Sequence, residues 1–252
     1  MQVKFAVKRL FRNIGLEIGR TSPDASLGLF VSTMLAHLGI NIVLDVGAHH
    51  GEFAMSLRNN GYQGEIASFE PIPAHLARLM RVSAHDPHWH VLPFALGSTD
   101  TEETINVATA GDLTSFRTPR TGTVERFTQL LQTEHTETVP VRRLDSILSE
   151  IAAGVEAPRI LLKLDTQGWD LEVLRGAEQS LGQVLAIQSE MAVQPLYENM
   201  PLYRESLDAF KRHGFELSAM FPINRDDAGA LIEFDGILVR PSGWQPHAPV
   251  FA

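Results

Sequence analysis

Short apolar segments alternate with amphipathic segments along most of this chain. The first apolar segment, at residues 42–46, contains several β-branched residues and is bounded by turn-forming residues. This pattern is typical of a buried strand. The same reasoning predicts strands at residues 65–69, 90–94, 103–108, 139–144, 160–164, 184–190, 215–220 and 236–239.

Segments with helical character separate these strands, and several end at a glycine, which is a common helix stop. We expect helices at residues 27–38, 52–60, 74–83, 146–152, 171–181 and 202–213, with stops at Gly39, Gly61 and Gly214. Strands that alternate with helices favour a mostly parallel, doubly wound sheet. The expected fold class is therefore α/β, of the Rossmann-like type.

The segment at residues 109–137 is polar, rich in threonine and poorly periodic. We expect a loop there with a short helix at residues 124–131, and irregular segments of this length often have a functional role. The sequence suggests an N-terminal helical extension (residues 1–40), one main domain (41–241) and a C-terminal tail (242–252).

Residues 3–18 combine basic and apolar side chains, and the charges interrupt any long apolar stretch. The segment is therefore expected to form a basic amphipathic helix rather than a signal peptide or a membrane span. Packing on the body of the protein or in a homodimer is the favoured interpretation. Contact with an anionic membrane surface is the alternative. Ser22 and Pro23 are expected to begin the next helix.

The chain has 252 residues, a formal net charge of -9 and no cysteine. The acidic balance argues against binding to a phosphate backbone, so nucleic acid is not an expected partner. The lack of cysteine excludes disulfides, thiolate nucleophiles and cysteine-ligated zinc. It also fits a cytoplasmic protein.

The first predicted strand leads into a turn, residues 47–51, that begins and ends with glycine and precedes a helix. Glycine lets a ligand approach the backbone closely, and a helix N-terminus favours negative or polar groups. Glu70 follows 23 residues after Gly47, at the end of the second predicted strand. Its carboxylate is suited to accept hydrogen bonds from ribose hydroxyls. Together these features predict a nucleoside-binding site.

His49 helps to decide between two kinds of nucleoside. Enzymes that bind NAD usually have a second glycine at this position, which makes room for a pyrophosphate. The imidazoles of His49 and His50 would crowd that group. S-adenosylmethionine carries no phosphate, so it is the favoured ligand, and an NAD-dependent oxidoreductase is the alternative.

Four segments of the chain resemble the FkbM-type methyltransferase family, in the expected order and spacing across residues 42–240. They are residues 45–53 (DVGAHHGEF), 69–71 (FEP), 94–97 (FALG) and 162–177 (LKLDTQGWDLEVLRGA). The resemblance implies a seven-stranded sheet with an antiparallel final strand and S-adenosylmethionine as methyl donor. It also implies a small hydroxylated acceptor, such as a sugar or a secondary metabolite.

The resemblance also implies a set of residues that contact the methyl donor. The turn would hold the methionine part, Glu70 the ribose, and Ala95 with Leu96 the adenine. The full set is Asp45, Gly47, Ala48, His49, Gly51, Phe53, Glu70, Pro71, Ala95, Leu96, Asp165, Thr166 and Gln167. Gln167 departs from the family, whose members often have glutamate there. Either a charge is lost, or the amide keeps the same hydrogen bonds.

Methylation of an alcohol requires a base that removes the hydroxyl proton. Asp165 is the first candidate because it ends a parallel strand, where ligands bind in this fold. Glu190, at the end of the next strand, is the second candidate. His49 or His50 is a further option, since neutral imidazole is a suitable base near pH 7.

Each candidate also has a structural interpretation. Asp165 would fix the donor or cap the next helix, and Glu190 would pair with Lys163 or Arg159. Asp165 and Glu190 could together hold a divalent cation, but no metal is expected. A non-catalytic module that binds S-adenosylmethionine also remains an alternative.

Two other groups of residues are candidates for contact with a metal ion or with the acceptor. His85, His88 and His90 are expected to lie in a surface loop and not to bind metal. Residues 112–116 fall where the family places pocket-closing residues, so Ser115 is a candidate contact to substrate or donor. The candidate walls of the acceptor pocket are Phe116, Trp169, Tyr197 and Met200, with packing in the core as the equal alternative for each.

Overall fold

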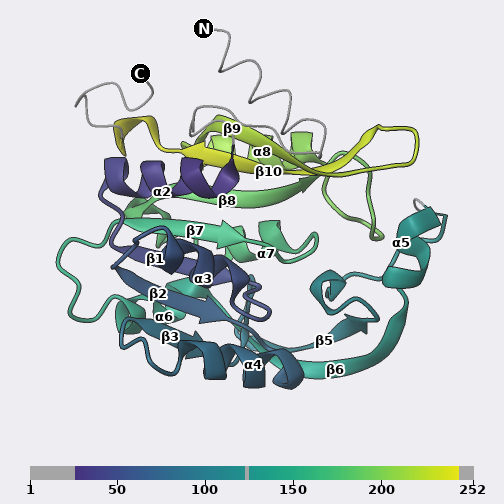
Figure 1. Cartoon of the computed structure of the whole chain (residues 1–252), viewed down its shortest axis with the longest axis horizontal. Helices are drawn as coiled ribbons and strands as arrows, with labels where there is room; N and C mark the ends of the chain where they lie inside the picture. The colour runs from purple at the N-terminus through teal and green to yellow at the C-terminus, as the bar shows by residue number, and fades with distance from the viewer. Residues whose placement is uncertain (1–25, 123–124, 244–252) are drawn as a thin grey trace, which may run out of the picture.

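The computed structural model describes residues 26–122 and 125–243, which form a central sheet with helices on both faces and a small second sheet (Figure 1). The central sheet has seven strands in the order β3-β2-β1-β7-β8-β10-β9. Its strands are β1 (Ile42–Val46), β2 (Glu65–Phe69), β3 (Trp89–Leu92), β7 (Ile160–Leu164), β8 (Val184–Ala192), β9 (Glu216–Arg225) and β10 (Leu231–Val239). The α/β fold class predicted from the sequence is confirmed.

Alternation along the central strands explains why both faces of the sheet are covered. In β1, Ile42 and Leu44 point to one face while Val43 points to the other. The first face packs against α6 (Leu144–Ile151), α7 (Asp170–Arg175) and α8 (Tyr203–Arg212). The second packs against α2 (Leu27–Leu38), α3 (Glu52–Asn59) and α4 (Pro73–Ser83). A central strand covered on both faces is expected to be almost continuously apolar.

The strands β3, β2, β1, β7 and β8 are parallel, whereas β10 is antiparallel to both of its neighbours, β8 and β9. The predicted antiparallel final strand is therefore confirmed. The register places Asp235 of β10 directly opposite Glu190 of β8. Directly opposed residues in such a pair have neighbouring side chains, so the topology brings two carboxyl groups together.

The second sheet has three strands, β4 (Ala95–Leu96), β5 (Thr101–Ala108) and β6 (Thr133–Arg142), in the order β4-β6-β5. It lies at the end of the central sheet toward which β1, β2 and β7 point (Figure 1). A 3-10 turn, η2 (Gly111–Leu113), and a short helix, α5 (Glu125–Leu130), connect β5 to β6. The sheet therefore stands beside the edge of the fold where ligands bind.

Several predicted boundaries near this sheet were wrong. Residues 133–137 belong to a strand and not to a loop, and Leu144 begins a helix instead of ending a strand. Only Val139 and Val141 of β6 are buried among mostly exposed polar residues. The apolar signal therefore covered only the second half of the strand. The helix predicted at 171–181 ends at Arg175, and the next residue, Gly176, lies against the backbone of Gly97, where a side chain would not fit.

The remaining short elements are the 3-10 turns η3 (Leu181–Gln183) and η4 (Pro241–Gly243). None of the helices in residues 26–122 and 125–243 is long and apolar enough to cross a membrane. The predicted basic helix at residues 3–18 and the predicted helix start at Ser22 and Pro23 lie outside the described residues.

Candidate active site

A cavity of about 520 Å³ opens where β1, β2, β7 and β8 end, and residues from the small sheet and η2 line its other side. Eleven of the predicted donor-binding residues and base candidates line this cavity: Gly47, Ala48, His49, Phe53, Glu70, Pro71, Ala95, Leu96, Asp165, Thr166 and Glu190. The cavity therefore lies at the edge of the sheet where ligands bind in doubly wound folds. Asp45, Gly51 and Gln167 do not line the cavity, and their contacts are with other parts of the protein.

The turn after β1 forms one wall of the cavity, and Gly47 is its tightest point. Gly47 has a φ of 78°. A Cβ atom there would lie 2.0 Å from the backbone oxygen of Asp165. No L-residue fits without moving one strand end away from the other. Gly51, with a φ of 88°, is needed for packing instead, because a Cβ there would meet Trp89 at 3.0 Å.

Glu70 is buried at the end of β2, and two backbone amides fix its carboxylate. His49 N–H donates to one oxygen and Ile72 N–H donates to the other, each at 2.8 Å. A carboxylate offers about four acceptor positions, so each oxygen can still accept another hydrogen bond. Because Glu70 also lines the cavity, it presents a fixed acceptor pair to a ligand.

Lys163 holds two strand ends together beneath the turn. Its Nζ lies 3.0 Å from Asp45 Oδ1 and 3.4 Å from Asp165 Oδ2. Burial by itself would lower the pKa of Lys163, but the carboxylates of Asp45 and Asp165 outweigh burial and raise the pKa above its ordinary value. Asp45 is fully buried and serves this ion pair. It does not form a cavity wall, contrary to the expectation of donor contact.

Glu190 has neither of the partners named in its structural interpretation. Lys163 pairs with the two aspartates, and Arg159 donates to the backbone oxygen of Leu38. Glu190 Oε1 instead accepts a hydrogen bond from Gln167 Nε2 at 3.0 Å. Sequence spacing could not reveal this, because the pairing depends on how β7 and β8 end.

Gln167 joins the two predicted base candidates. Its Nε2 also lies 3.3 Å from Asp165 Oδ1, and its Oε1 accepts from the Tyr197 hydroxyl at 3.2 Å. The backbone of Gln167 has a φ of 50°, and the Ser115 hydroxyl donates to its carbonyl oxygen at 2.7 Å. Ser115 and Tyr197 therefore position Gln167 and do not line the cavity, contrary to their predicted roles.

Two further carboxyl groups, Asp235 and Glu233, accompany Glu190. Asp235 lines the cavity, and the buried carboxylate of Glu233, which accepts a hydrogen bond from Asn224 Nδ2, is close enough to Glu190 to raise its pKa. Burial raises the pKa of Glu190 well above its usual range, and the charges of Asp165, Glu233 and Asp235 raise it further. Burial likewise raises the pKa of Asp235 to about 6.

The sequence reasoning did not include Glu233 and Asp235. A signal was present, because they are two acidic residues on one face of the otherwise largely apolar segment 231–239. Alternate residues of a strand share a face, so the two carboxyl groups were bound to lie on the same side of the sheet.

The aromatic residues form a layer on the side of the small sheet. Phe116 lines the cavity, and its ring lies 4.9 Å from that of Trp169 between centroids. Trp169, Tyr197 and Met200 do not line the cavity. Of the four predicted acceptor-pocket walls, only Phe116 is in position.

Two of the histidines that were expected in a surface loop lie at the edge of the central sheet. His88 and His90 contact the two carboxylate oxygens of Glu65, at 2.7 Å and 2.9 Å. Both imidazoles are more than half exposed. The carboxylate of Glu65 thus serves as the hydrogen-bond partner of both imidazoles, at a site outside the cavity.

Replacing Tyr197 with phenylalanine is expected to destabilise the protein by roughly 1–3 kcal/mol. The single proton of the buried hydroxyl serves the carbonyl oxygen of Leu113 at 2.7 Å and Gln167 Oε1 at 3.2 Å, so its loss leaves at least one buried acceptor without a donor. Thermal unfolding measures the effect. Tyr62→Phe is the control, because its hydroxyl makes one long contact of 3.4 Å. Equal effects of the two substitutions would contradict this role for Tyr197.

Comparison with known proteins agrees with this geometry. A family model described as the methyltransferase FkbM domain matches residues 45–217. The 2-O-methyltransferase NoeI of Sinorhizobium fredii (strain NBRC 101917 / NGR234) is 29% identical over 190 residues, which are 72% of this chain and 74% of the relative.

The chain is also similar in fold to solved structures, of which two serve as examples. Fibrillarin of Aeropyrum pernix, in complex with S-adenosyl-L-methionine, has 11% identity and a TM-score of 0.45, over 83% of this chain and 74% of that one. An rRNA methylase from Streptococcus thermophilus has 11% identity and a TM-score of 0.44, over 88% and 99%. The family match covers more than half of the chain and includes the turn, Glu70 and Asp165. The chain therefore belongs to the FkbM methyltransferase family and is an S-adenosylmethionine-dependent methyltransferase.

Proposed function

We propose that the cavity binds S-adenosylmethionine along the turn and Glu70, and that the enzyme transfers the methyl group to a hydroxyl of a small acceptor. The observation that carries the proposal is a single cavity lined at one side by Gly47 and Glu70 and at another by Glu190 and Asp235. One side has features that suit a nucleoside, and the other has features that suit removal of a proton.

The residues fit the donor in size and chemistry. A cavity of about 520 Å³ is in the range of small-molecule sites. The missing side chain at Gly47 leaves backbone exposed, and the fixed carboxylate of Glu70 has free acceptor positions for two hydroxyls. When bound, S-adenosylmethionine supplies an electrophilic methyl group on a sulfonium. The protein contributes mainly position and orientation to such a displacement.

Within this proposal, Glu190 is the general base. Asp165 is already engaged in an ion pair with the ammonium of Lys163. Glu190 makes no ion pair with any described residue and has a raised pKa. A base works best when its pKa approaches the working pH. Asp165 then helps to position Gln167, which contacts Glu190, and is not the base.

The charge of the acceptor side narrows the acceptor class. Asp165, Glu190 and Asp235 face the cavity together, and several carboxylates repel an anionic acceptor. A neutral polyhydroxylated molecule, such as a sugar, fits this side better than a phosphorylated one. The name of the Sinorhizobium fredii relative, a 2-O-methyltransferase, also supports an oxygen acceptor.

The two alternatives have less support. The match to the FkbM methyltransferase family gives no support to an NAD-dependent oxidoreductase. A non-catalytic module is disfavoured because the amide of Gln167 contacts the carboxylates of both Asp165 and Glu190 and so holds the two base candidates in place.

S-adenosylhomocysteine, the product of the donor, is expected to stabilise the protein. At about a hundred times its dissociation constant, a ligand stabilises the folded state by roughly 2.7 kcal/mol, which corresponds to a rise in Tm of roughly 5–10 °C for a chain of this size. NAD at the same excess is expected to leave Tm unchanged. A rise with NAD alone would refute the proposal.

A further inference from the structure

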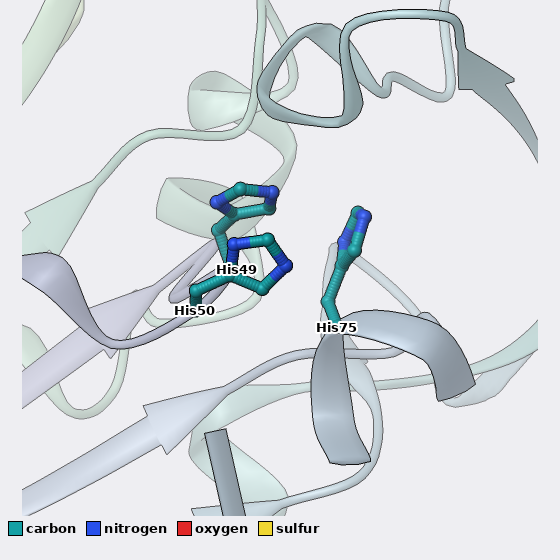
Figure 2. Close-up of side chains that lie close together, drawn as sticks. All are labelled: His49, His50 and His75. Carbon is teal, nitrogen blue, oxygen red and sulfur yellow. The ribbon is translucent and has the colours of Figure 1, made fainter. Parts of the chain in front are cut away.

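Three histidines gather at the rim of the cavity, and the proposed methyl transfer does not use them as a group. His49 and His50 come from the turn after β1, and His75 comes from the first turn of α4 (Figure 2). Their ring centroids lie 3.7 Å (His49–His50), 4.4 Å (His49–His75) and 5.2 Å (His50–His75) apart. The side chains are 27%, 23% and 12% exposed, respectively, so they form a partly enclosed pocket of imidazoles.

The ring nitrogens are close enough to share one ion. One nitrogen from each histidine lies within 4.8 Å of the others. Zinc binds histidine nitrogen at about 2.0–2.1 Å, so nitrogens around one tetrahedral ion are about 3.3 Å apart. Modest side-chain rotations would bring the three rings to that spacing.

Carboxylates lie behind the imidazoles, as they do at many metal sites. Glu52 contacts Nδ1 of both His49 and His50 at 3.7 Å, and Glu70 lies 3.5 Å from Nδ1 of His75. Histidine ligands usually direct their second ring nitrogen to such a partner. The Glu52 side chain is 57% exposed, so it is also free to turn toward an ion.

We propose that His49, His50 and His75 form a binding site for one divalent transition-metal ion of the zinc type, with Glu52 as a fourth ligand or hydrogen-bond partner. Imidazole nitrogen together with carboxylate oxygen is a common zinc ligand set. The ion would link the donor-binding turn, which precedes Glu70 in the chain, to α4, which follows it. Gly111 of η2 lies directly against the cluster, since a Cβ there would be 2.8 Å from His75 Nε2. The site would thus lie where the small sheet closes over the cavity.

The experiment uses the full chain without a histidine tag, freed of metal with a chelator and then titrated with Zn²⁺ against a chromophoric competitor. We expect one ion per chain. His50→Ala and His75→Ala should each weaken binding by at least about 100-fold, and Glu52→Gln by about 10- to 100-fold. Co²⁺ in place of Zn²⁺ should give visible absorption bands in the wild type that both histidine variants lack.

His88→Ala is the matched control, because His88 belongs to the exposed pair on Glu65. It should bind Zn²⁺ like the wild type. Thermal unfolding in chelator checks that each variant folds. Because the side chain of Glu52 is exposed, Glu52→Gln is not expected to disturb the core. Absence of a wild-type site, or equal affinity in the wild type, His50→Ala, His75→Ala and Glu52→Gln, would overturn the proposal. The readout is metal binding alone, so it is independent of the assignment of the methyl acceptor.

Discussion

Glu190→Gln is expected to lower kcat by about 10²- to 10⁴-fold, the usual contribution of a general base. The affinity for S-adenosylhomocysteine should change little. The substitution keeps the shape of the side chain, and the oxygen of the new amide can still accept the hydrogen bond from Gln167 Nε2. Only the capacity to take a proton is lost. Release of S-adenosylhomocysteine, measured with a hydroxylated acceptor that the wild type methylates, gives kcat.

The pH dependence separates Glu190 from Asp165. A base acts only when deprotonated, so wild-type kcat should fall as the pH drops through the pKa of Glu190. Because burial and neighbouring carboxylates raise that pKa, the fall should occur above about pH 4.3, where an ordinary glutamate titrates. Glu190→Gln should abolish this limb, whereas Asp165→Asn should retain it. A limb that survives in Glu190→Gln and disappears in Asp165→Asn would assign the base to Asp165.

Gly47→Ala is expected to destabilise the protein by more than about 4 kcal/mol, a loss typical of severe strain. A Cβ atom at Gly47 would lie 2.0 Å from Asp165 O, so β1 and β7 would have to separate at their ends. Since both residues line the cavity, affinity for S-adenosylhomocysteine should also fall, by more than about tenfold. Thermal unfolding and ligand titration measure the two effects.

Gly154→Ala is the matched control for this substitution. Gly154 has a φ of 83°, close to the 78° of Gly47, but open space surrounds it. It therefore carries the conformational cost of a left-handed alanine, about 1–2 kcal/mol, without the collision. If both substitutions cost the same, the close approach of Gly47 to Asp165 is unimportant.

The sequence by itself determined the order of elements and one side of the site. The apolar segments at 42–46, 65–69 and 160–164 match β1, β2 and β7 residue for residue, because strands covered on both faces must be apolar. Gly47 and Glu70 could be placed from local spacing alone, since both follow directly on such strands. The family model matches residues 45–217, which include Gly47 and Glu70.

Only the tertiary structure decided how the acceptor side is built. The sequence predicted β5 and the second half of β6 as strands, but the first half of β6 was missed because it is exposed and polar, and the separate sheet that these strands form with β4 was not expected. The grouping of Glu190 with Glu233 and Asp235 depends on the antiparallel register of β10 against β8. The meeting of His75 with His49 and His50 depends on how α4 packs beside the turn. Local sequence patterns report which residues are buried, but contacts between residues distant in the chain depend on strand order and register, which those patterns do not specify.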